Sequence, residues 1–293
     1  MEKDKNKMEN KKLAELLEHL EYELVQGTLD REIPAVVYDS RKVVPGCLFL
    51  CIGGANFDGH DFAAQVAEQG AGVLVVQKDV ELPENVDVTV VKVVDTRYAM
   101  AFISAAWFGH PAEKLKVIGI TGTKGKTTTA YYLQSMLDAC LKKQGGNGCA
   151  LLSSIEYYDG KTREASTLTT PESLELCRHM RNAVDAGLSH MVMEVSSQAL
   201  KYERVGNTHF DTAIFLNISK DHISPTEHKD FDDYFQSKLK IFDRCTCACV
   251  NLDSDHIGEI LKAAAKCERV VTFGSKENAV IRVSDIKPGR GKF

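Results

Sequence analysis

The sequence lacks a long apolar run and a strong net charge, and each absence excludes a class of partner. No apolar stretch reaches the roughly 18 residues of a membrane-spanning helix, and the charged segment from Met1 to Lys12 does not resemble a secretion signal. The formal net charge is −5, which gives no general attraction to nucleic acid or to an anionic membrane. We therefore expect neither partner, and local cations and helix N-termini must hold any anionic ligand.

Regular cysteine spacing is also missing. The chain has nine cysteines, an odd number, and no paired C-x-x-C or Cys/His spacing of the kind that binds zinc. Cys245, Cys247 and Cys249 alternate along a predicted strand and would share one of its faces. This pattern favours reduced, half-buried thiols in a cytoplasmic protein.

The order of apolar segments predicts an α/β protein of two domains. Residues 1–110 alternate short apolar strands with helices, among them a leucine stripe expected to be helical over 12–24, and Pro111 marks a linker. Residues 111–293 alternate strands and helices again, as a mostly parallel sheet requires. The last predicted strand, 279–286, has no closing helix, so either the sheet ends on an edge strand or the chain is a fragment.

The most informative stretch is Val117 to Thr129, VIGITGTKGKTTT. An apolar strand precedes two glycines, and a helix is expected to follow, which is the context of a phosphate-binding loop. Lys126 can reach the β- and γ-phosphates, and the Thr127 hydroxyl can bind Mg²⁺. The G-x-x-G-K-T spacing is tighter than the common form, but a lysine followed by three threonines makes an ordinary glycine turn improbable. The stretch predicts a nucleoside triphosphate site.

Polar residues follow several later strands, where a parallel sheet presents side chains to a ligand. Glu194 ends an apolar strand and suits either a Mg²⁺ site or a plain strand end. Ser196 suits substrate contacts or an ordinary turn, and Thr169–Thr170 suit an anion site or a helix cap. Asn217 and the pair Asp221–His222 end the next strand. On its helix, Lys238 is either functional or part of a solvated face.

The order and spacing of these motifs resemble the Mur ligases, ATP-dependent amide-bond-forming enzymes of peptidoglycan synthesis, and most closely their MurE type. The stretches that carry the resemblance are Asp39–Arg41, Gly122–Thr128, Thr169–Glu172, Met193–Leu200 with Arg204, Asn217–His222 and Tyr234–Lys238. The resemblance implies a UDP-muramoyl-binding α/β domain over 1–110 and a P-loop-type, mostly parallel central ATPase domain over 111–293. This second domain would be incomplete at its C-terminal end.

The resemblance also implies roles for individual residues. ATP would be held by Gly122, Thr123, Lys124, Gly125, Lys126, Thr127, Thr128 and Asn217. One Mg²⁺ would lie on Thr127 and Glu194, with His222 and a carbamylated Lys238 as further metal ligands. Lys126, Lys238 and His222 would be the catalytic residues. Ser40 would contact the UDP moiety, and the muramoyl peptide would meet Thr169, Thr170, Ser196 and Arg204.

The implied reaction adds an amino acid, diaminopimelate or L-lysine, to UDP-N-acetylmuramoyl-L-alanyl-D-glutamate through an acyl phosphate, in a cytoplasmic and monomeric enzyme. Three features depart from the family pattern: Lys124 replaces an asparagine, the second histidine after Asp221 is displaced to His228, and the family's third domain is missing. We therefore predict that these 293 residues alone lack normal turnover. The alternatives are another Mur-like ligase, of the folylpolyglutamate or cyanophycin type, and a non-catalytic nucleotide-binding fragment.

Overall fold

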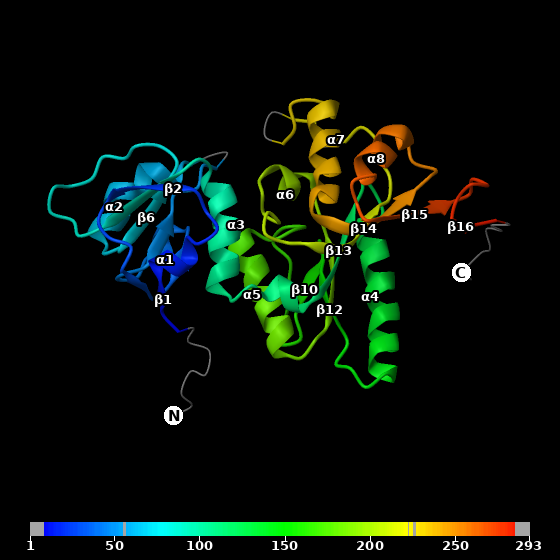
Figure 1. Cartoon of the computed structure of the whole chain (residues 1–293), viewed down its shortest axis with the longest axis horizontal. Coiled ribbons are helices and arrows are strands. Elements are labelled where there is room, and N and C mark those ends of the chain that lie inside the picture. The colour runs from blue at the N-terminus through cyan, green and yellow to red at the C-terminus, as the bar shows by residue number, and fades with distance from the viewer. Residues whose placement is uncertain (1–8, 55–56, 222, 225–226, 285–293) are drawn as a thin grey trace. The chain divides into compact units, whose positions relative to one another are not determined.

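The computed structural model describes residues 9–54, 57–221, 223–224 and 227–284 (Figure 1). Contacts within the chain divide it into two compact units. The first comprises Met1–His110 with the short segment Tyr202–Asn207, and the second comprises Pro111–Lys201 with Thr208–Phe293. Within the described ranges, no helix is long and apolar enough to cross a membrane.

The first unit is built on a sheet whose described strands have the order β2-β7-β6-β5-β4. β4 to β7 are parallel, and β2 pairs antiparallel with β7 at one edge. The strands are β2 (Tyr22–Gln26), β4 (Val36–Val37), β5 (Leu48–Leu50), β6 (Val73–Val76) and β7 (Thr89–Val93); a separate ladder joins β1 (Lys11–Lys12) to β3 (Glu32–Ile33). β5 and β6 are buried at every residue, as expected for parallel strands covered on both faces.

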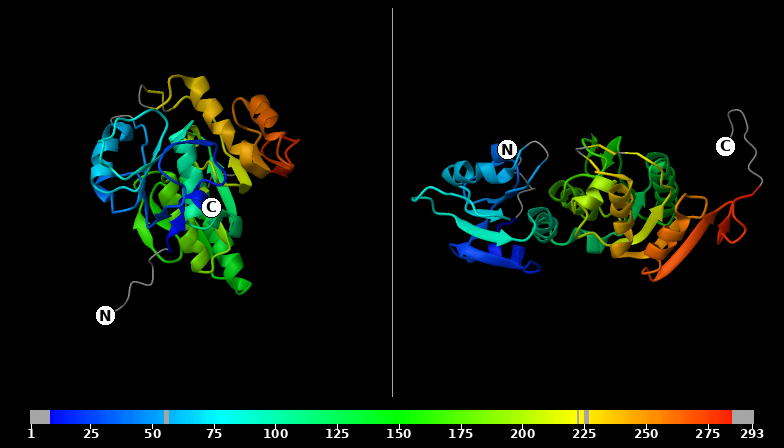
Figure 2. Two further views of the ribbon diagram at one scale, coloured as in Figure 1. Left: turned by 60° about the vertical axis from the view of Figure 1, so that its left-hand side comes forward. Right: turned by 90° about the horizontal axis from the view of Figure 1, so that it is seen from above.

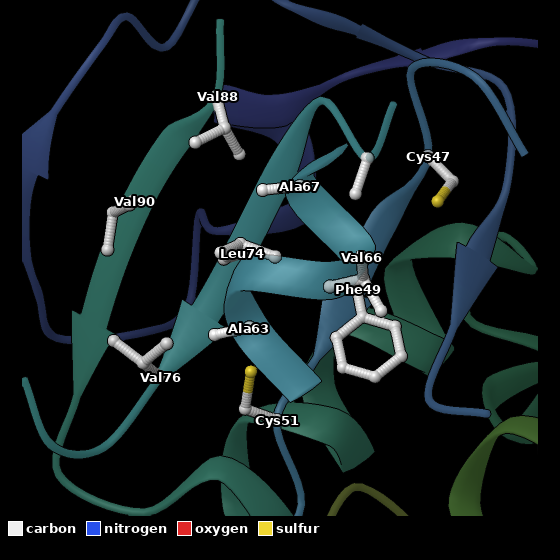
Figure 3. Packing of buried hydrophobic residues seen from close by; sticks show 11 residues of the cluster. Cys47, Phe49, Cys51, Ala63, Val66, Ala67, Leu74, Val76, Val88 and Val90 are labelled. Carbon is white, nitrogen blue, oxygen red and sulfur yellow. The ribbon is translucent and has the colours of Figure 1, made fainter. Parts of the chain in front are cut away.

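Short helices complete this unit. They are α1 (Leu13–Leu16), η1 (Ser40–Lys42), η2 (Gly59–Phe62), α2 (Ala63–Glu68) and α3 (Thr96–Trp107). Figure 3 shows the core cluster in which Val66 of α2 joins Phe49 of β5 and Leu74 of β6. Burying such side chains is the main favourable term in folding, at about 25 cal/mol per Å² of apolar surface.

The predicted helix over 12–24 is wrong beyond its first turn. Leu13, Leu16 and Leu17 are buried as the stripe predicts, but α1 ends at Leu16. Leu24 lies in β2 instead and is 40% exposed. Pairing of β2 with β7 satisfies the backbone of this segment, so tertiary context overrides a local helical spacing.

The second unit contains a larger sheet, whose described strands have the order β11-β10-β9-β12-β8-β13-β14-β15-β16. The strands β9-β12-β8-β13-β14-β15-β16 are parallel to one another. β10 and β11 add an antiparallel hairpin at the β9 edge. The strands are β8 (Lys116–Thr121), β9 (Cys149–Leu152), β10 (Glu156–Tyr158), β11 (Arg163–Ala165), β12 (His190–Glu194), β13 (Phe210–Phe215), β14 (Cys245–Asn251), β15 (Arg269–Gly274) and β16 (Ile281–Arg282). Figure 2 shows β16, in red, at the other edge of this sheet.

Helices pack against this sheet and against one another. They are η3 (Pro111–Lys114), α4 (Lys126–Lys143), α5 (Ser173–Asp185), α6 (Ser197–Lys201), α7 (Phe231–Leu239), η4 (Lys240–Arg244) and α8 (Ile257–Ala264). α4 covers β8, β9 and β12, and α7 packs against α6 and α8. Ala130 of α4 joins Ile120, Leu151 and Val192 in a buried cluster below the helix. The predicted α/β class with mostly parallel sheets is confirmed.

Candidate active site

A glycine-containing loop, residues 122–125, joins the end of β8 to the start of α4. Gly122 has φ of 151° and Gly125 has φ of 87°, both in the region that favours glycine. A Cβ on Gly122 would also lie 3.0 Å from the Cβ of Leu216. α4 begins at Lys126, and the first-turn N–H groups of a helix have no intrahelical acceptor. The start of α4 therefore supplies backbone donors and a positive helix end beside the loop, which suits a phosphate.

Asn217, just after β13, braces this loop. Its side-chain oxygen accepts from the N–H of Thr123 at 3.1 Å and from that of Lys124 at 2.9 Å. Its side-chain nitrogen donates to the Lys124 carbonyl at 3.0 Å. The amide thus holds the Lys124 peptide from both sides, while residue 124 itself is exposed. The contribution of Lys124 to the loop is made by its backbone.

Thr127, in the first turn of α4, meets the carboxylate of Glu194. The Thr127 hydroxyl donates to Glu194 Oε2 at 3.0 Å, and Glu194 is 1% exposed. Ser154 completes the cluster, because its N–H and hydroxyl donate to Glu194 Oε1 at 2.8 and 3.2 Å. Hydroxyl and carboxylate oxygens are the ligands that Mg²⁺ prefers, so this donor set fits that ion. The sequence reasoning missed Ser154, although it follows β9 just as Ser196 follows β12.

Lys126 folds back over the loop. Its Nζ donates to the carbonyl oxygens of Gly122 at 2.9 Å and Thr123 at 3.2 Å. Burial lowers the pKa of Lys126, and the negative charge of Glu194 partly opposes this shift. The ammonium group is therefore held at the loop and poorly hydrated, so an anion placed there would interact with it strongly.

Lys238 reaches the same loop from α7. It is 1% exposed, its Nζ donates to the Gly122 carbonyl at 3.0 Å, and it lies 4.7 Å from the centre of the Tyr234 ring. The alternative of a solvated helix face is therefore wrong. Burial, followed by the nearby charge of Lys126, lowers the pKa of Lys238 well below its ordinary value.

Tyr234 connects α7 to the loop by a hydrogen bond. Its hydroxyl donates to Thr123 Oγ1 at 3.1 Å, and the residue is fully buried. Burial raises the pKa of Tyr234 to about 12, so the hydroxyl keeps its proton and remains a donor. The aromatic ring and the lysine four residues later come from one helix face, which the i, i+4 spacing places together.

Thr170 lies between the end of β12 and the start of α6. Its hydroxyl donates to the Glu194 carbonyl at 2.9 Å and accepts from the N–H of Ser196 at 3.0 Å. Thr170 is buried and Thr169 is partly buried. The helix-cap alternative is wrong for this pair, because α5 begins only at Ser173 and is preceded by Glu172. The two threonines and Ser196 therefore lie beside the Glu194 cluster.

Two of the remaining predicted residues belong to the first unit. Ser40 opens η1 in the first unit, next to Asp39. Hydrogen bonds from Arg41 lower the pKa of Asp39 to about 2, which keeps this turn charged and fixed. Arg204 also belongs to the first unit, in the segment Tyr202–Asn207. His222 lies outside the described residues.

Family models match both parts of the chain. The Mur ligase middle domain matches residues 120–292, and the Mur ligase family, catalytic domain, matches residues 32–108. The first of these models covers more than half of the chain, so the chain belongs to the Mur ligase family.

Individual relatives agree with this assignment. The chain is 38% identical over 278 residues to the UDP-N-acetylmuramoyl-L-alanyl-D-glutamate–2,6-diaminopimelate ligase of Clostridium perfringens, covering 94% of this chain and 56% of that protein. It is 42% identical over 249 residues to the corresponding L-lysine ligase of Enterococcus faecalis, covering 84% and 47%. The chain thus spans about half the length of these curated relatives.

Solved structures share the fold. A structure of a UDP-N-acetylmuramoyl-L-alanyl-D-glutamate–2,6-diaminopimelate ligase superposes with a TM-score of 0.72 at 19% identity, covering 94% of this chain and 55% of that chain. The MurF ligase of Thermotoga maritima, solved in complex with ADP, gives a TM-score of 0.51 at 20% identity, covering 82% and 50%.

Proposed function

We propose that the chain forms the nucleotide- and UDP-sugar-binding part of an ATP-dependent ligase that adds an amino acid to UDP-N-acetylmuramoyl-L-alanyl-D-glutamate. The observation that carries this proposal is the buried Glu194 carboxylate bonded to Thr127 at the start of α4, beside two lysines that reach the Gly122 carbonyl. The names of the relatives from Clostridium and Enterococcus support the choice of substrate. Diaminopimelate and L-lysine both remain candidates for the added amino acid.

The nucleotide would lie on residues 122–128, with Lys126 at its terminal phosphates. Thr127 and Glu194 would hold Mg²⁺, which would screen charge between the phosphates and the substrate carboxylate. His222 and a carbamate on Lys238 would supply further oxygen and nitrogen ligands. A neutral amine is the form that reacts with CO₂, and the lowered pKa of Lys238 supports that form.

The reaction begins from a poor acyl donor, because a free carboxylate does not expel oxygen. Transfer of the γ-phosphoryl group to this carboxylate gives an acyl phosphate, and attack by the incoming amine then releases phosphate. The contribution of the chain would be to place the two anions together, through the N–H groups at the start of α4 and Lys126. Ser40 would contact the UDP moiety, while Thr169, Thr170, Ser196 and Arg204 would contact the muramoyl peptide.

The free thiols support a reducing compartment for this enzyme. Each of the nine cysteines lies in the described ranges and is unpaired, and most are buried. Disulfides are rare in the cytoplasm, so this pattern is consistent with a cytoplasmic enzyme. We take it to act as a monomer.

Titration calorimetry of the purified chain tests the proposal. ATP with Mg²⁺ and UDP-N-acetylmuramoyl-L-alanyl-D-glutamate should each bind, whereas a folate monoglutamate, the substrate expected for the folylpolyglutamate alternative, should not. Binding of the folate in place of the UDP-sugar would replace the proposed substrate. If the chain bound neither ATP nor the UDP-sugar, the proposal would be refuted.

A further inference from the structure

His228 is a fully buried histidine whose two ring nitrogens both face partners in the second unit. Its Nε2 lies 2.9 Å from Ser197 Oγ, and its Nδ1 lies 3.2 Å from Asp233 Oδ2. Ser197 is the first residue of α6, and Asp233 lies in the first turn of α7. The imidazole therefore joins the starts of two helices.

The partners determine which nitrogen carries the proton. A carboxylate accepts hydrogen bonds only, so Nδ1 donates to Asp233 and Nε2 accepts from the Ser197 hydroxyl. Asp233 Oδ2 also accepts from Lys201 Nζ at 2.6 Å and from the Lys229 N–H at 3.2 Å. The carboxylate is thereby neutralised by Lys201 and does not depend on a charged imidazole.

The two helices carry residues already placed at the site. Ser197 directly follows Ser196, whose N–H donates to Thr170, on the side proposed for the muramoyl peptide. On the other side, the His228 ring packs edge-on against Tyr234, with centroids 5.2 Å apart and planes at 70°. Tyr234 in turn donates to Thr123 of the loop. His228 thus contacts the supports of both proposed substrate sites, by a hydrogen bond on one side and by ring packing on the other.

A serine, a histidine and an aspartate in this order also occur in hydrolases, where the serine is a nucleophile. Ser197 is 4% exposed and His228 is fully buried. The Ser197 hydroxyl donates its hydrogen bond to the buried imidazole and is not exposed to a substrate. A structural contact that positions neighbours accounts better for this burial.

We propose that His228 is a positioning residue that fixes α6 and Ser196 through Ser197, and fixes Tyr234 and the phosphate-binding loop through its ring. The inference rests on the proposed function for the identity of the ligands. It predicts that mutation can separate the two contacts: loss of the hydrogen bond to Ser197 should affect the UDP-sugar, and loss of the ring packed on Tyr234 should also affect ATP.

Three variants separate the two contributions. Ser197→Ala removes the hydroxyl, His228→Phe keeps the ring but removes both hydrogen bonds, and His228→Ala removes both contributions. His209→Ala is the matched control, since His209 is an exposed histidine of the same unit that contacts Thr246. Calorimetry measures affinity for Mg²⁺–ATP and for UDP-N-acetylmuramoyl-L-alanyl-D-glutamate, and hydrogen exchange measures protection of α6.

We expect Ser197→Ala and His228→Phe each to weaken binding of the UDP-sugar about tenfold, a loss of ~1.4 kcal/mol, with ATP affinity within about twofold of the original. A double variant that combines Ser197→Ala with His228→Phe should bind the UDP-sugar no more weakly than His228→Phe alone, because both substitutions remove the hydrogen bond between Ser197 and His228. His228→Ala should weaken both ligands. In all three variants α6 should exchange faster while β9 and β12 keep their protection.

Unchanged UDP-sugar affinity in His228→Phe would overturn the inference, as would equal loss of both ligands with faster exchange throughout the unit. Should the original chain fail to bind the UDP-sugar, the proposed function falls, and exchange in α6 decides the positioning role by itself. Unaltered α6 protection in Ser197→Ala and His228→Phe would then refute it.

Discussion

Lys126 and Lys238 donate hydrogen bonds to one and the same acceptor, the carbonyl oxygen of Gly122, at 2.9 and 3.0 Å. One lysine comes from the helix that follows the loop and the other from α7, more than a hundred residues later. Burial is the main cause of the lowered pKa of Lys238, and repulsion between the two ammonium groups on this oxygen adds to it. The arrangement keeps positive charge at the loop and favours the neutral form of Lys238.

Replacing Lys126 should weaken nucleotide binding. Lys126→Ala removes a partly buried cation from the proposed phosphate site, and a lost hydrogen bond to a charged group costs roughly 1.5–3 kcal/mol, or about 10- to 150-fold in affinity. Titration with Mg²⁺–ATP measures the effect. Lys142→Ala is the control, because this surface lysine lies in the last turn of α4, away from the loop, and pairs with Asp138. Unchanged affinity in Lys126→Ala would remove the phosphate-site assignment.

Asn217→Ala should loosen the loop without removing a charge. The variant loses three hydrogen bonds with the loop backbone. Two are donated by the N–H groups of Thr123 and Lys124, and one is accepted by the carbonyl oxygen of Lys124. We expect ATP affinity to fall about fivefold, corresponding to ~1 kcal/mol. Asn147→Ala serves as control, since that exposed amide donates to Ala186 away from the loop. Equal effects of the two variants would contradict the bracing role.

Glu194→Gln should abolish the benefit of Mg²⁺ for nucleotide binding. The amide keeps the shape of the side chain but has one oxygen and no charge, which makes it a poor ligand for a hard cation. ATP affinity is measured with and without Mg²⁺; the gain on adding the metal should disappear, while metal-free binding should be retained. Glu259→Gln, at an exposed glutamate of α8, should keep the gain. A full Mg²⁺ effect in Glu194→Gln would place the metal elsewhere.

Asp159 should make the chain sensitive to acid. Burial alone would raise its pKa, but hydrogen bonds from His179, Asn182 and the N–H groups of Thr162 and Lys161 lower it below the ordinary 3.8. A carboxyl with a lowered folded-state pKa stabilises the fold above its unfolded pKa, and this stability is lost as pH falls through the folded-state pKa.

Asp159→Asn should therefore cost about 3 kcal/mol of unfolding free energy near neutral pH, and the difference from the original chain should shrink as pH falls below about 4. Urea unfolding at a series of pH values measures this. Asp243→Asn, where a surface carboxylate pairs with Lys266, should cost less than about 1 kcal/mol. A difference that stays constant with pH would show that Asp159 contributes through shape alone.

Sequence patterns predicted the parts of the site that depend on local order. The order of strand, two glycines, lysine and helix is local, so the glycine loop between β8 and α4 could be predicted from spacing alone. Its role in binding phosphate stays a prediction. The leucine stripe over 12–24 failed for the opposite reason. The second half of this stripe becomes strand β2 because it pairs with β7, about seventy residues away. No local pattern encodes that pairing.

The sequence by itself determined the α/β class, the glycine loop between β8 and α4, and the polar residues that follow several parallel strands, because these depend on neighbours in the chain. Only the tertiary structure decided what those residues do to one another. Asn217 braces the loop, Ser154 completes the Glu194 cluster, and Lys238 is buried on Gly122. These contacts join segments about 40 to 115 residues apart, and their distances and desolvation arise only when the sheet brings those segments together.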